Sequence, residues 1–305
     1  MESAITLEGV SKRYGRVRAL DEVSLSVPEG SAMAVLGENG AGKTTMIRII
    51  LGLAFRDGGR AMIRGMDAEN HRARRNVRYL PERVRFPEWA TPLDVFRHLE
   101  RIRRESGLSE FVRRAEELQC GDLLKRAFGK MSKGQSQRLA LALAVSGSPS
   151  MVILDEPSAG LDPGGRILIR RTISALAAGG ATILLCSHLL GEVEQVCSHA
   201  AFLNRGRLVA GDSLENLSRF TGAAEILTPE PGRMAEALAA GGYACRTEQG
   251  GVTAALKGEG SISLLAAAAA ATGVPFSSIA LKRETLEDVF MRVTEGAADN
   301  VSQRP

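Results

Sequence analysis

The sequence predicts an α/β protein whose larger part is built on a mainly parallel sheet. Apolar runs typical of buried strands alternate with helical patterns such as residues 166–178, and these runs lie at 32–36, 151–155, 181–187 and 201–204. Such alternation favours helices on both faces of a parallel sheet. The composition changes after about Phe220, where alanine and glycine become more frequent. A second, smaller domain is expected to begin there.

The first strands depart from this pattern. Apolar and polar residues alternate at 5–10 and 20–27, which predicts an antiparallel β subdomain beside the main sheet. Between residues 70 and 147 the pattern is almost wholly helical, which predicts a helical subdomain inserted before the strand at 151–155. The first domain is therefore expected to span residues 1–217.

The order of strand and helix patterns beyond residue 222 predicts a small α+β sandwich of the ferredoxin-like type. We expect strands and helices to alternate there, with strands at 224–227, 244–256 and 277–281 and helices at 233–240, 261–271 and 286–294. This accessory domain is expected to span residues 222–295. The last residues, 296–305, are expected to form a disordered tail.

Charge and composition narrow the classes of partner. The 305 residues contain 39 Lys and Arg against 35 Asp and Glu, and the resulting net charge of +4 does not by itself imply nucleic acid. The arginine-rich interval 72–114 is either a basic face for phosphate backbones or acidic lipid, or a solvated helical face, and the solvated face is the more common case.

Targeting and cysteine patterns are also informative. The first residues, MESAI, carry neither a basic leader nor an apolar core, so we expect no secretory signal. No apolar run approaches the roughly 20 residues that cross a bilayer, so membrane association is expected through a partner. Cysteines stand at 120, 186, 197 and 245 without C-x-x-C spacing, which favours reduced thiols over zinc or disulfides.

The run at residues 37–45 predicts a phosphate-binding loop, because it lies between the apolar stretch 32–36 and a helical pattern at 46–53. Its glycines let consecutive backbone N–H groups close around a polyphosphate, and the following helix adds the positive end of its dipole. The expected ligand is ATP or GTP, and the alternative is a flexible turn with a solvated lysine. The candidate binding residues are Gly37, Glu38, Asn39, Gly40, Ala41, Gly42, Lys43, Thr44 and Thr45.

Two residues of this loop have separate roles from the rest. Lys43 is expected to place a positive charge on the terminal phosphates, and the hydroxyl of Thr44 is of the type that coordinates Mg²⁺.

The strand at 151–155 supplies further ligands, because it ends in Asp155 and Glu156. Asp155 suits the Mg²⁺ shell, and Glu156 suits a general base for the attacking water. The alternative for this pair is a solvated acidic turn before Pro157.

With these motifs in this order, the chain resembles the nucleotide-binding subunit of an ATP-binding cassette (ABC) transporter over residues 1 to about 217. The resemblance implies a P-loop NTPase fold and binding of ATP with Mg²⁺. Tyr14 resembles the aromatic residue that stacks on adenine, and His188 resembles the histidine that contacts the γ-phosphate. The segment 131–135, MSKGQ, resembles the family signature LSGGQ, which implicates Ser132, Gly134 and Gln135.

In this family the signature closes over a nucleotide held by a second, oppositely oriented subunit, so one chain would hold half of each site. The segment 158–162, called the linking segment below, resembles the family segment that connects the two sites, and it implicates Asp162. The expected partners are a second ATPase subunit, either a copy of this chain or a paralogue, and an integral membrane permease.

Three residues depart from the common family pattern. Glu82 stands where many members have a glutamine that meets Mg²⁺, so it is a candidate for both the metal shell and the catalytic set. Lys133 replaces a glycine of the signature and adds positive charge near the shared phosphate. Glu38 replaces a frequent proline, and its side chain is expected to face away from the nucleotide.

Finer features resemble the subgroup whose membrane partners are of the ABC-2 type, usually exporters. These features are Glu82, the lysine in the signature and the closing segment 285–290, TLEDVF. Residues 83–99, with Phe86, Trp89 and Phe96, are expected either to receive the coupling helices of a membrane subunit or to form the core of the helical subdomain.

The function expected from the sequence is therefore that of an ATPase subunit which drives a separate permease from the cytoplasmic face of the membrane, as a peripheral protein. Two alternatives stay open. One is a soluble ABC ATPase that acts on nucleic acid or ribosomes, although no specific nucleic-acid partner is expected. The other is a regulatory module that binds ATP and hydrolyses it slowly. The cargo is not encoded in this chain, because the membrane subunit recognises it.

Overall fold

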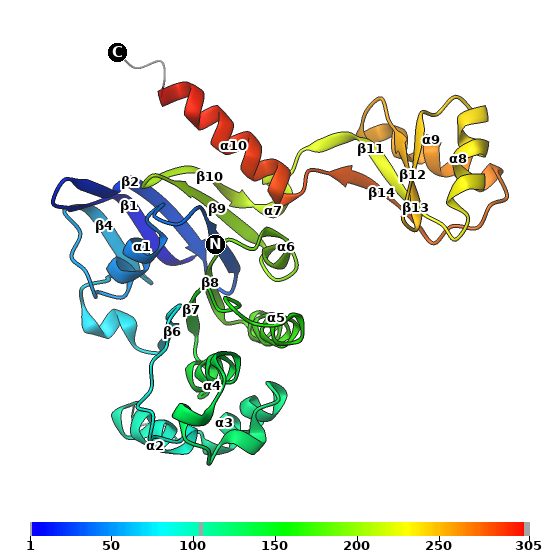
Figure 1. The fold of residues 1–305 in the computed structure, drawn as a ribbon. Coiled ribbons are helices and arrows are strands. Elements are labelled where there is room, and N and C mark those ends of the chain that lie inside the picture. Colours follow the sequence, from blue (N-terminus) through cyan, green and yellow to red (C-terminus); the bar gives the residue numbers. More distant parts are fainter. Residues whose placement is uncertain (1, 104–105, 302–305) are drawn as a thin grey trace. The chain divides into compact units, whose positions relative to one another are not determined.

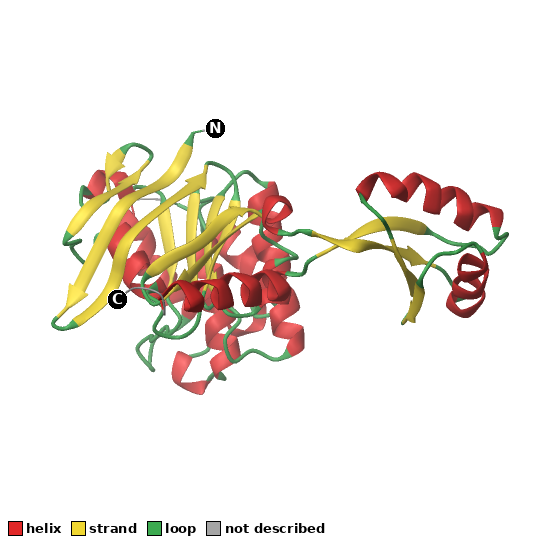
Figure 2. Ribbon diagram, turned by 90° about the horizontal axis from the view of Figure 1, so that it is seen from above, coloured by secondary structure: helices red, strands yellow, loops and turns green. Residues whose placement is uncertain are grey.

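The computed structural model describes residues 2–103 and 106–301, and the chain divides into two compact units. The first unit comprises residues up to Leu214 together with the chain from Val293, and the second is Glu215–Arg292. Figures 1 and 2 show the ribbon of both units in two views. Each unit is described separately below.

The first unit is built on a six-stranded sheet with the strand order β10-β9-β3-β8-β7-β6. Neighbouring strands are parallel except for β10, which pairs antiparallel with β9. The strands are β3 (Ala32–Leu36), β6 (Val77–Leu80), β7 (Met151–Asp155), β8 (Thr182–Ser187), β9 (His199–Asn204) and β10 (Arg207–Ser213). Every residue of β3, β7 and β8 is buried, as expected for parallel strands covered on both faces. The parallel sheet that the apolar runs predicted is thus confirmed.

A second, antiparallel sheet carries the N-terminal strands in the order β2-β1-β4-β5. Its strands are β1 (Ser3–Tyr14), β2 (Val17–Pro28), β4 (Gly58–Ile63) and β5 (Met66–Asp67). Helix α1 (Lys43–Ile50) packs against this sheet, and its buried face shares one apolar core with Ile5, Leu20 and Val35. This core fixes the start of α1 relative to both sheets, and Figure 1 shows α1 beside β1 and β4.

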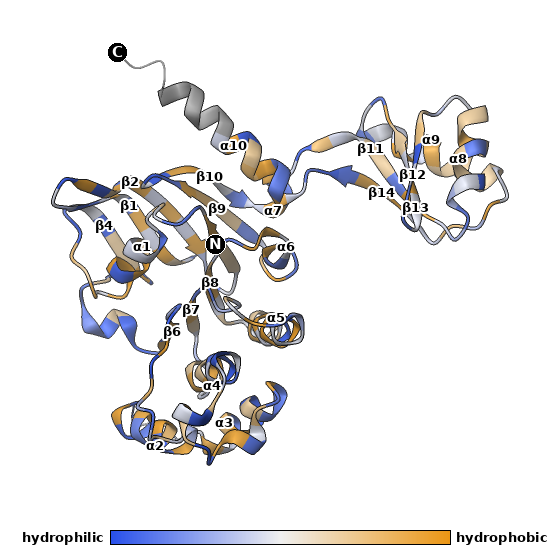
Figure 3. Cartoon of the chain, in the orientation of Figure 1, coloured by the Kyte–Doolittle hydropathy of each residue, from blue (hydrophilic) through white to orange (hydrophobic). Residues whose placement is uncertain are grey.

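The helical subdomain is formed by α2 (Pro92–Arg103), α3 (Leu108–Glu117) and α4 (Lys133–Val145), with short turns at Gly121–Leu123 and Phe128–Lys130. Hydrophilic and hydrophobic residues alternate along α2 and α3 in Figure 3, as amphipathic helices require. The apolar faces meet through the stacked rings of Phe96 and Phe111, whose centroids are 4.8 Å apart. Phe86 stacks on Phe128 at 4.2 Å, whereas 79% of Trp89 is exposed.

The expected start of this subdomain at residue 70 is wrong. The chain first forms a short turn at His71–Arg74 and then strand β6, which pairs with β7 at the edge of the central sheet. Strand β6 has only four residues, and one of them is Arg78, so it does not stand out in the sequence as an apolar run. In the structure Arg78 and Leu80 are buried. Pairing with the buried β7, rather than local sequence, makes it a strand.

The remaining helices of the first unit flank the central sheet. They are α5 (Pro163–Ala178) and α6 (Leu190–Val193), and α7 (Leu214–Leu217) lies where the two units join in sequence. Asp162 caps α5 by accepting a hydrogen bond from Gly165 N at 2.9 Å, which fixes the helix start after the linking segment. Within residues 2–103 and 106–301, no helix is both long and apolar enough to cross a bilayer.

The second unit is a four-stranded antiparallel sheet with the order β12-β13-β11-β14. Its elements follow the chain as β11 (Phe220–Leu227), α8 (Pro231–Ala240), β12 (Cys245–Glu248), β13 (Gly251–Ala255), a short turn at Glu259–Ser261, α9 (Ile262–Ala271) and β14 (Ser278–Arg283). This βαββαβ order is the one that a ferredoxin-like plan requires. Both helices contribute to one apolar core, which contains Ile226, Leu238, Val252 and Leu265.

The final helix, α10 (Leu286–Val301), extends into the region that was expected to be a disordered tail. Residues 296–301 are helical rather than disordered, and residues 302–305 lie outside the described part of the chain. Alanines at 297 and 298 extend the helical pattern past Gly296, whose weak propensity suggested a stop. Thr285 begins the helix well, because its hydroxyl donates to Asp288 at 2.7 Å and accepts from Asp288 N at 3.2 Å.

Candidate active site

The turn between β3 and α1 has a backbone path that only glycine permits at two of its positions. Gly37, Gly40 and Gly42 have φ angles of 157°, 85° and 110°, respectively, in the region that L side chains rarely adopt. A Cβ on Gly37 would collide with the carbonyl oxygen of Leu203, and one on Gly42 would lie 2.5 Å from that of Ala19. The neighbouring strands therefore dictate glycine at 37 and 42.

Lys43 occupies the interior of this loop. Its side chain is buried, and Nζ donates hydrogen bonds to the carbonyl oxygens of Gly37 and Glu38. The same Nζ lies 4.0 Å from Glu156 Oε1. The loop thus holds an ammonium group at its centre, close to the end of β7, while Glu38, Asn39 and Gly40 are exposed.

Asp155 and Thr44 meet at the ends of neighbouring elements. The Thr44 hydroxyl donates to Asp155 Oδ2 at 3.3 Å, and Asp155 is only 3% exposed. Burial raises the pKa of Asp155; the hydrogen bond from Thr44 opposes this, and the charges of Glu156 and Glu82 raise the pKa further. A carboxylate in this position is stabilised by added positive charge, so the donor set of Thr44 and Asp155 fits a divalent cation.

Glu156 follows directly, and within the described residues only one of its two carboxylate oxygens is hydrogen-bonded. Its φ of 49° is unusual for a residue with a side chain, and its N–H donates to Cys186 O at 2.9 Å. Its Oε2 lies 2.8 Å from His188 Nδ1. Its Oε1 is buried and makes no hydrogen bond within the described residues. One oxygen is therefore anchored and the other is left for a further donor.

Glu82 and Tyr79 stand at the end of β6, beside the same carboxylates. Glu82 is exposed, with Oε1 3.8 Å from Arg83 Nε, and its charge acts on Asp155. Burial, followed by the charge of Asp155, raises the pKa of Tyr79 to about 12. Tyr79 is the third of the four β6 residues and pairs with Ile153 of β7; sequence reasoning missed it because β6 itself was not predicted.

Tyr14 lies at the tip of the β1–β2 hairpin, where it pairs with Val17. It is 46% exposed, and Lys12 Nζ lies 5.4 Å from the centroid of its ring. Lys12 is in turn held by Asp57 at 2.8 Å. Tyr14 thus presents an exposed aromatic ring at the end of the antiparallel sheet, as stacking on a base requires.

The signature residues form the start of α4. The Ser132 hydroxyl accepts from Gln135 N at 3.2 Å, and Gln135 Oε1 accepts from Ser132 N at 3.0 Å, which makes a complete capping box. In Figure 1, α4 lies with α2 and α3, whereas α1 lies beside the antiparallel sheet. No hydrogen bond or ion pair within the described residues joins Ser132, Gly134 or Gln135 to the loop at 37–45.

The structure therefore brings together some predicted site residues and separates others. Lys43, Thr44, Asp155, Glu156 and His188 form one connected cluster. The signature residues lie on another element, and the carboxylate of Asp162 caps α5, which gives it a structural partner within its own helix.

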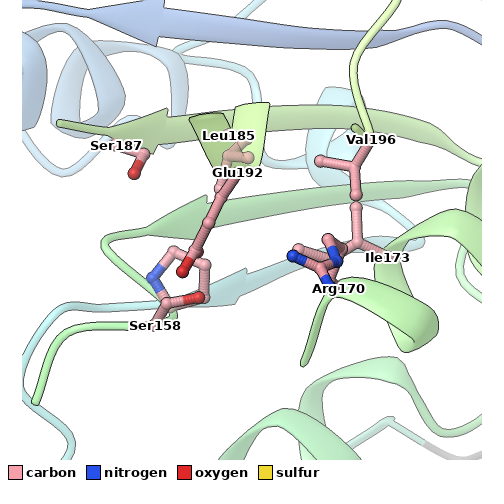
Figure 4. A pocket seen from close by; sticks show the side chains of 8 residues that line it. Ser158, Arg170, Ile173, Leu185, Ser187, Glu192 and Val196 are labelled. Atoms are coloured by element: carbon pink, nitrogen blue, oxygen red, sulfur yellow. The ribbon is translucent and has the colours of Figure 1, made fainter. Parts of the chain in front are cut away.

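A small pocket is lined in part by Pro157 and by Ser158 of the linking segment, and Figure 4 shows it. Ser158 lies two residues after Glu156, and Ser187 directly precedes His188; both line the pocket together with Arg170, Leu185 and Glu192. Glu192 Oε1 lies 3.8 Å from Arg166 Nη1 on α5. The residues around the pocket include none from the loop at 37–45, so this pocket is not the phosphate-binding loop.

Comparison with known proteins gives one consistent family. The family described as ABC transporter matches residues 20–159. The daunorubicin resistance ATP-binding protein DrrA2 of Streptomyces coeruleorubidus is 31% identical, over 99% of this chain and 98% of that protein. The Nod factor export ATP-binding protein I of Ralstonia nicotianae is 34% identical, over 68% of this chain and 66% of that protein.

A solved structure of an ATP-binding subunit of an ABC transporter superposes with a TM-score of 0.65 at 29% identity, over 70% of this chain and 92% of that one. The near-complete coverage of DrrA2 and the shared fold agree with the loop at 37–45 and the carboxylates at the end of β7. The chain therefore belongs to the ATP-binding subunits of ABC transporters, and it is a nucleotide-binding P-loop ATPase.

Proposed function

We propose that the chain hydrolyses ATP with Mg²⁺ to power export through a separate integral membrane permease. Family membership supports the coupling to transport, and the names of two relatives support the direction, since one concerns daunorubicin resistance and the other Nod factor export. The names of these two relatives refer to different compounds, daunorubicin and a Nod factor, yet both relatives are similar in sequence to this chain. The cargo is therefore expected to be selected by the membrane subunit.

The arrangement of Glu156 is the observation that carries the ATPase mechanism. His188 holds Oε2, while Oε1 is buried, makes no hydrogen bond to any residue that the structure describes, and lies 4.0 Å from the ammonium nitrogen of Lys43. A buried acceptor without a partner is costly, and such groups are retained where they take part in a reaction. We assign Oε1 to accept the proton of the water that attacks the γ-phosphate.

The neighbouring side chains have supporting roles in this proposal. Lys43 neutralises the terminal phosphates, and its place inside the loop already fits that role. His188 orients Glu156 through Nδ1 and presents its other ring nitrogen to the γ-phosphate. Thr44 and Asp155 would hold Mg²⁺, and Glu82 would add a third oxygen ligand. When bound, Mg²⁺ would neutralise part of the negative charge of the phosphates.

A second ATPase subunit, either a copy of this chain or a paralogue, would complete the site. Tyr14 is exposed for stacking on adenine, but Ser132, Gly134 and Gln135 lie on α4, away from the loop at 37–45 of their own chain. An oppositely oriented partner would bring its own α4 to this loop, and its linking segment with Asp162 would lie at the shared boundary. Closure would then require the γ-phosphate and end on hydrolysis.

Trp89 is the residue that best supports a peripheral location beside a membrane subunit. Phe86 and Phe96 pack within the helical subdomain, whereas 79% of Trp89 is exposed. Of the two expected roles for these aromatics, the core role therefore fits Phe86 and Phe96, and the docking role fits Trp89. We place the chain at the cytoplasmic face of the membrane, where Trp89 would contact the permease.

The nucleic-acid alternative has less support, because several arginines of the interval 72–114 are engaged within the chain. Arg74 bonds the carbonyl oxygen of Ala68, and Arg113 and Arg114 pair with Glu117. These contacts favour a solvated, internally paired helical face over a surface that binds phosphate backbones.

The variant Glu156→Gln tests the proposed function. The amide keeps the size of the side chain and its bond to His188 but cannot take a proton, so steady-state phosphate release should fall by about 10²–10⁴-fold. Size-exclusion chromatography with light scattering should show that ATP and Mg²⁺ convert this variant to a dimer. The control is Glu8→Gln, which changes an exposed carboxylate on β1. Near-normal phosphate release by Glu156→Gln would remove Glu156 from the role of base.

A further inference from the structure

The back of the phosphate-binding loop contacts the β9–β10 turn, residues 204–207. Gly206 N donates to Ala41 O of the loop at 2.9 Å, and Gly206 O accepts from Asp21 N of β2 at 2.8 Å. Arg205 and Gly206 have φ angles of 46° and 80°, which is the backbone of a two-residue hairpin turn. The two backbone groups of Gly206 therefore join the loop to β2.

This contact fixes the direction of one backbone N–H group of the loop. In a trans peptide the C=O and N–H groups point in opposite directions. Because Ala41 O is bound to Gly206 N, the N–H of Gly42 in the same peptide unit points away from the turn. Gly42 N donates no hydrogen bond within the described residues. The contact with the turn thus leaves this N–H available to a phosphate oxygen of the nucleotide.

A charge pair holds the turn in this place. Arg207, the residue after Gly206, donates from Nε to Asp21 Oδ2 at 2.6 Å, and its Nη2 lies 2.5 Å from the same oxygen. The other oxygen, Asp21 Oδ1, accepts from Arg18 Nη1 at 2.6 Å. Burial raises the pKa of Asp21, but the hydrogen bonds from Arg207 and Arg18 outweigh it and hold the pKa below its usual value. Asp21 and Arg207 therefore form a charged pair at neutral pH.

We propose that Asp21 and Arg207 are positioning residues for nucleotide binding, because they hold Gly206 against Ala41 and so aim the N–H of Gly42 at the phosphates. Neither side chain touches the nucleotide; the pair acts through the backbone of the β9–β10 turn. By linkage, a phosphate that binds Gly42 N should in return strengthen the contact between Gly206 and Ala41. The inference concerns nucleotide binding by a single chain and does not depend on export or on a second subunit.

The variant Arg207→Met tests the proposal, since methionine keeps an unbranched apolar stem and removes the pair with Asp21. Equilibrium titration with ATP and Mg²⁺ should show a Kd raised about five- to tenfold, part of the value of one hydrogen bond to a charged group. In steady-state phosphate release, KM for ATP should rise while kcat stays nearly unchanged, because the lost contact binds ground state and transition state alike. Arg207→Lys should restore part of the affinity.

The matched control is Arg18→Met, which removes the other arginine from the same carboxylate but lies outside the β9–β10 turn. It should leave the Kd for ATP unchanged.

A second readout is the exchange rate of the Gly206 amide hydrogen, followed by NMR. Exchange should be faster in Arg207→Met than in Arg18→Met, and ATP should slow it in the unaltered chain. If Arg207→Met lowers the melting temperature but leaves the Kd for ATP and the Gly206 exchange rate unchanged, the pair only stabilises the fold and the proposal is overturned. Equal loss of ATP affinity in Arg18→Met would overturn it too, because charge near the loop, and not the turn, would then be responsible. If Arg207→Met does not fold, Arg207→Lys against Arg18→Lys provides the same comparison.

Discussion

Replacing Gly42 by alanine tests whether the phosphate-binding loop is held in shape by its neighbours. The new Cβ would lie 2.5 Å from Ala19 O and 2.9 Å from Leu20 Cδ2, and φ at this position is 110°. Gly40→Ala is the matched control, because its φ of 85° is also positive but, beyond its two chain neighbours, no atom of the described residues lies within 4 Å of the new Cβ. The pair therefore separates backbone strain from steric overlap within one loop.

The expected losses of stability follow from the cost of backbone strain and the cost of steric overlap. A left-handed conformation costs a residue with a side chain about 1–2 kcal/mol, so Gly40→Ala should lower the free energy of unfolding by about that amount. Overpacking adds about 1–3 kcal/mol, so Gly42→Ala should lose about 2–5 kcal/mol in total. The overlap involves the backbone of β2, which cannot rotate away as a flexible side chain can.

Urea unfolding of the nucleotide-free protein, followed by a probe in the first unit, measures both losses. Binding of a fluorescent ATP analogue measures the consequence for function, and Gly42→Ala should bind it much more weakly than Gly40→Ala does. Equal losses of stability in the two variants would refute the reasoning, because the carbonyl oxygen of Ala19 would then have no part in shaping the loop.

Further predictions concern the carboxylates, the adenine contact and the helical subdomain. Because folding raises the pKa of Asp155, its negative charge destabilises the nucleotide-free fold above that raised pKa. Asp155→Asn should therefore increase the melting temperature at pH 7, and this gain should shrink as the pH falls through the raised pKa. An unchanged melting temperature at pH 7 would contradict the burial argument. Glu82→Gln removes a proposed oxygen ligand, so the Mg²⁺ concentration for half-maximal phosphate release should rise; a lower requirement would exclude Glu82 from the metal shell. Tyr14→Ala should weaken ATP binding about fivefold or more while Tyr14→Phe preserves it, as equilibrium titration would show. Phe111→Ala opens a cavity beside Phe96 and should cost about 3–5 kcal/mol by urea unfolding, with Phe55→Ala, an exposed residue, as the control.

Local patterns predicted much of the fold and site because the relevant interactions are short in sequence. The loop at 37–45 depends on glycine spacing between a strand and a helix, and the buried strands are continuous apolar runs. The chemistry of Asp155 and Glu156 follows from their position at a strand end. Strand β6 and the helical residues 296–301 were missed, because the first depends on pairing with β7 and the second on a helix that continues past Gly296.

The sequence by itself determined which groups carry the chemistry, since an ammonium group, a hydroxyl and two carboxylates are needed whatever their surroundings. Only the tertiary structure decided how these groups are used. It joins Glu156 to His188 at the ends of β7 and β8, leaves Glu156 Oε1 without a hydrogen-bond partner among the described residues, and places Lys133 Nζ beside Gly160 of a distant segment. Such contacts link residues far apart in the chain, and their distances are set by sheet pairing and core packing, which no local pattern records.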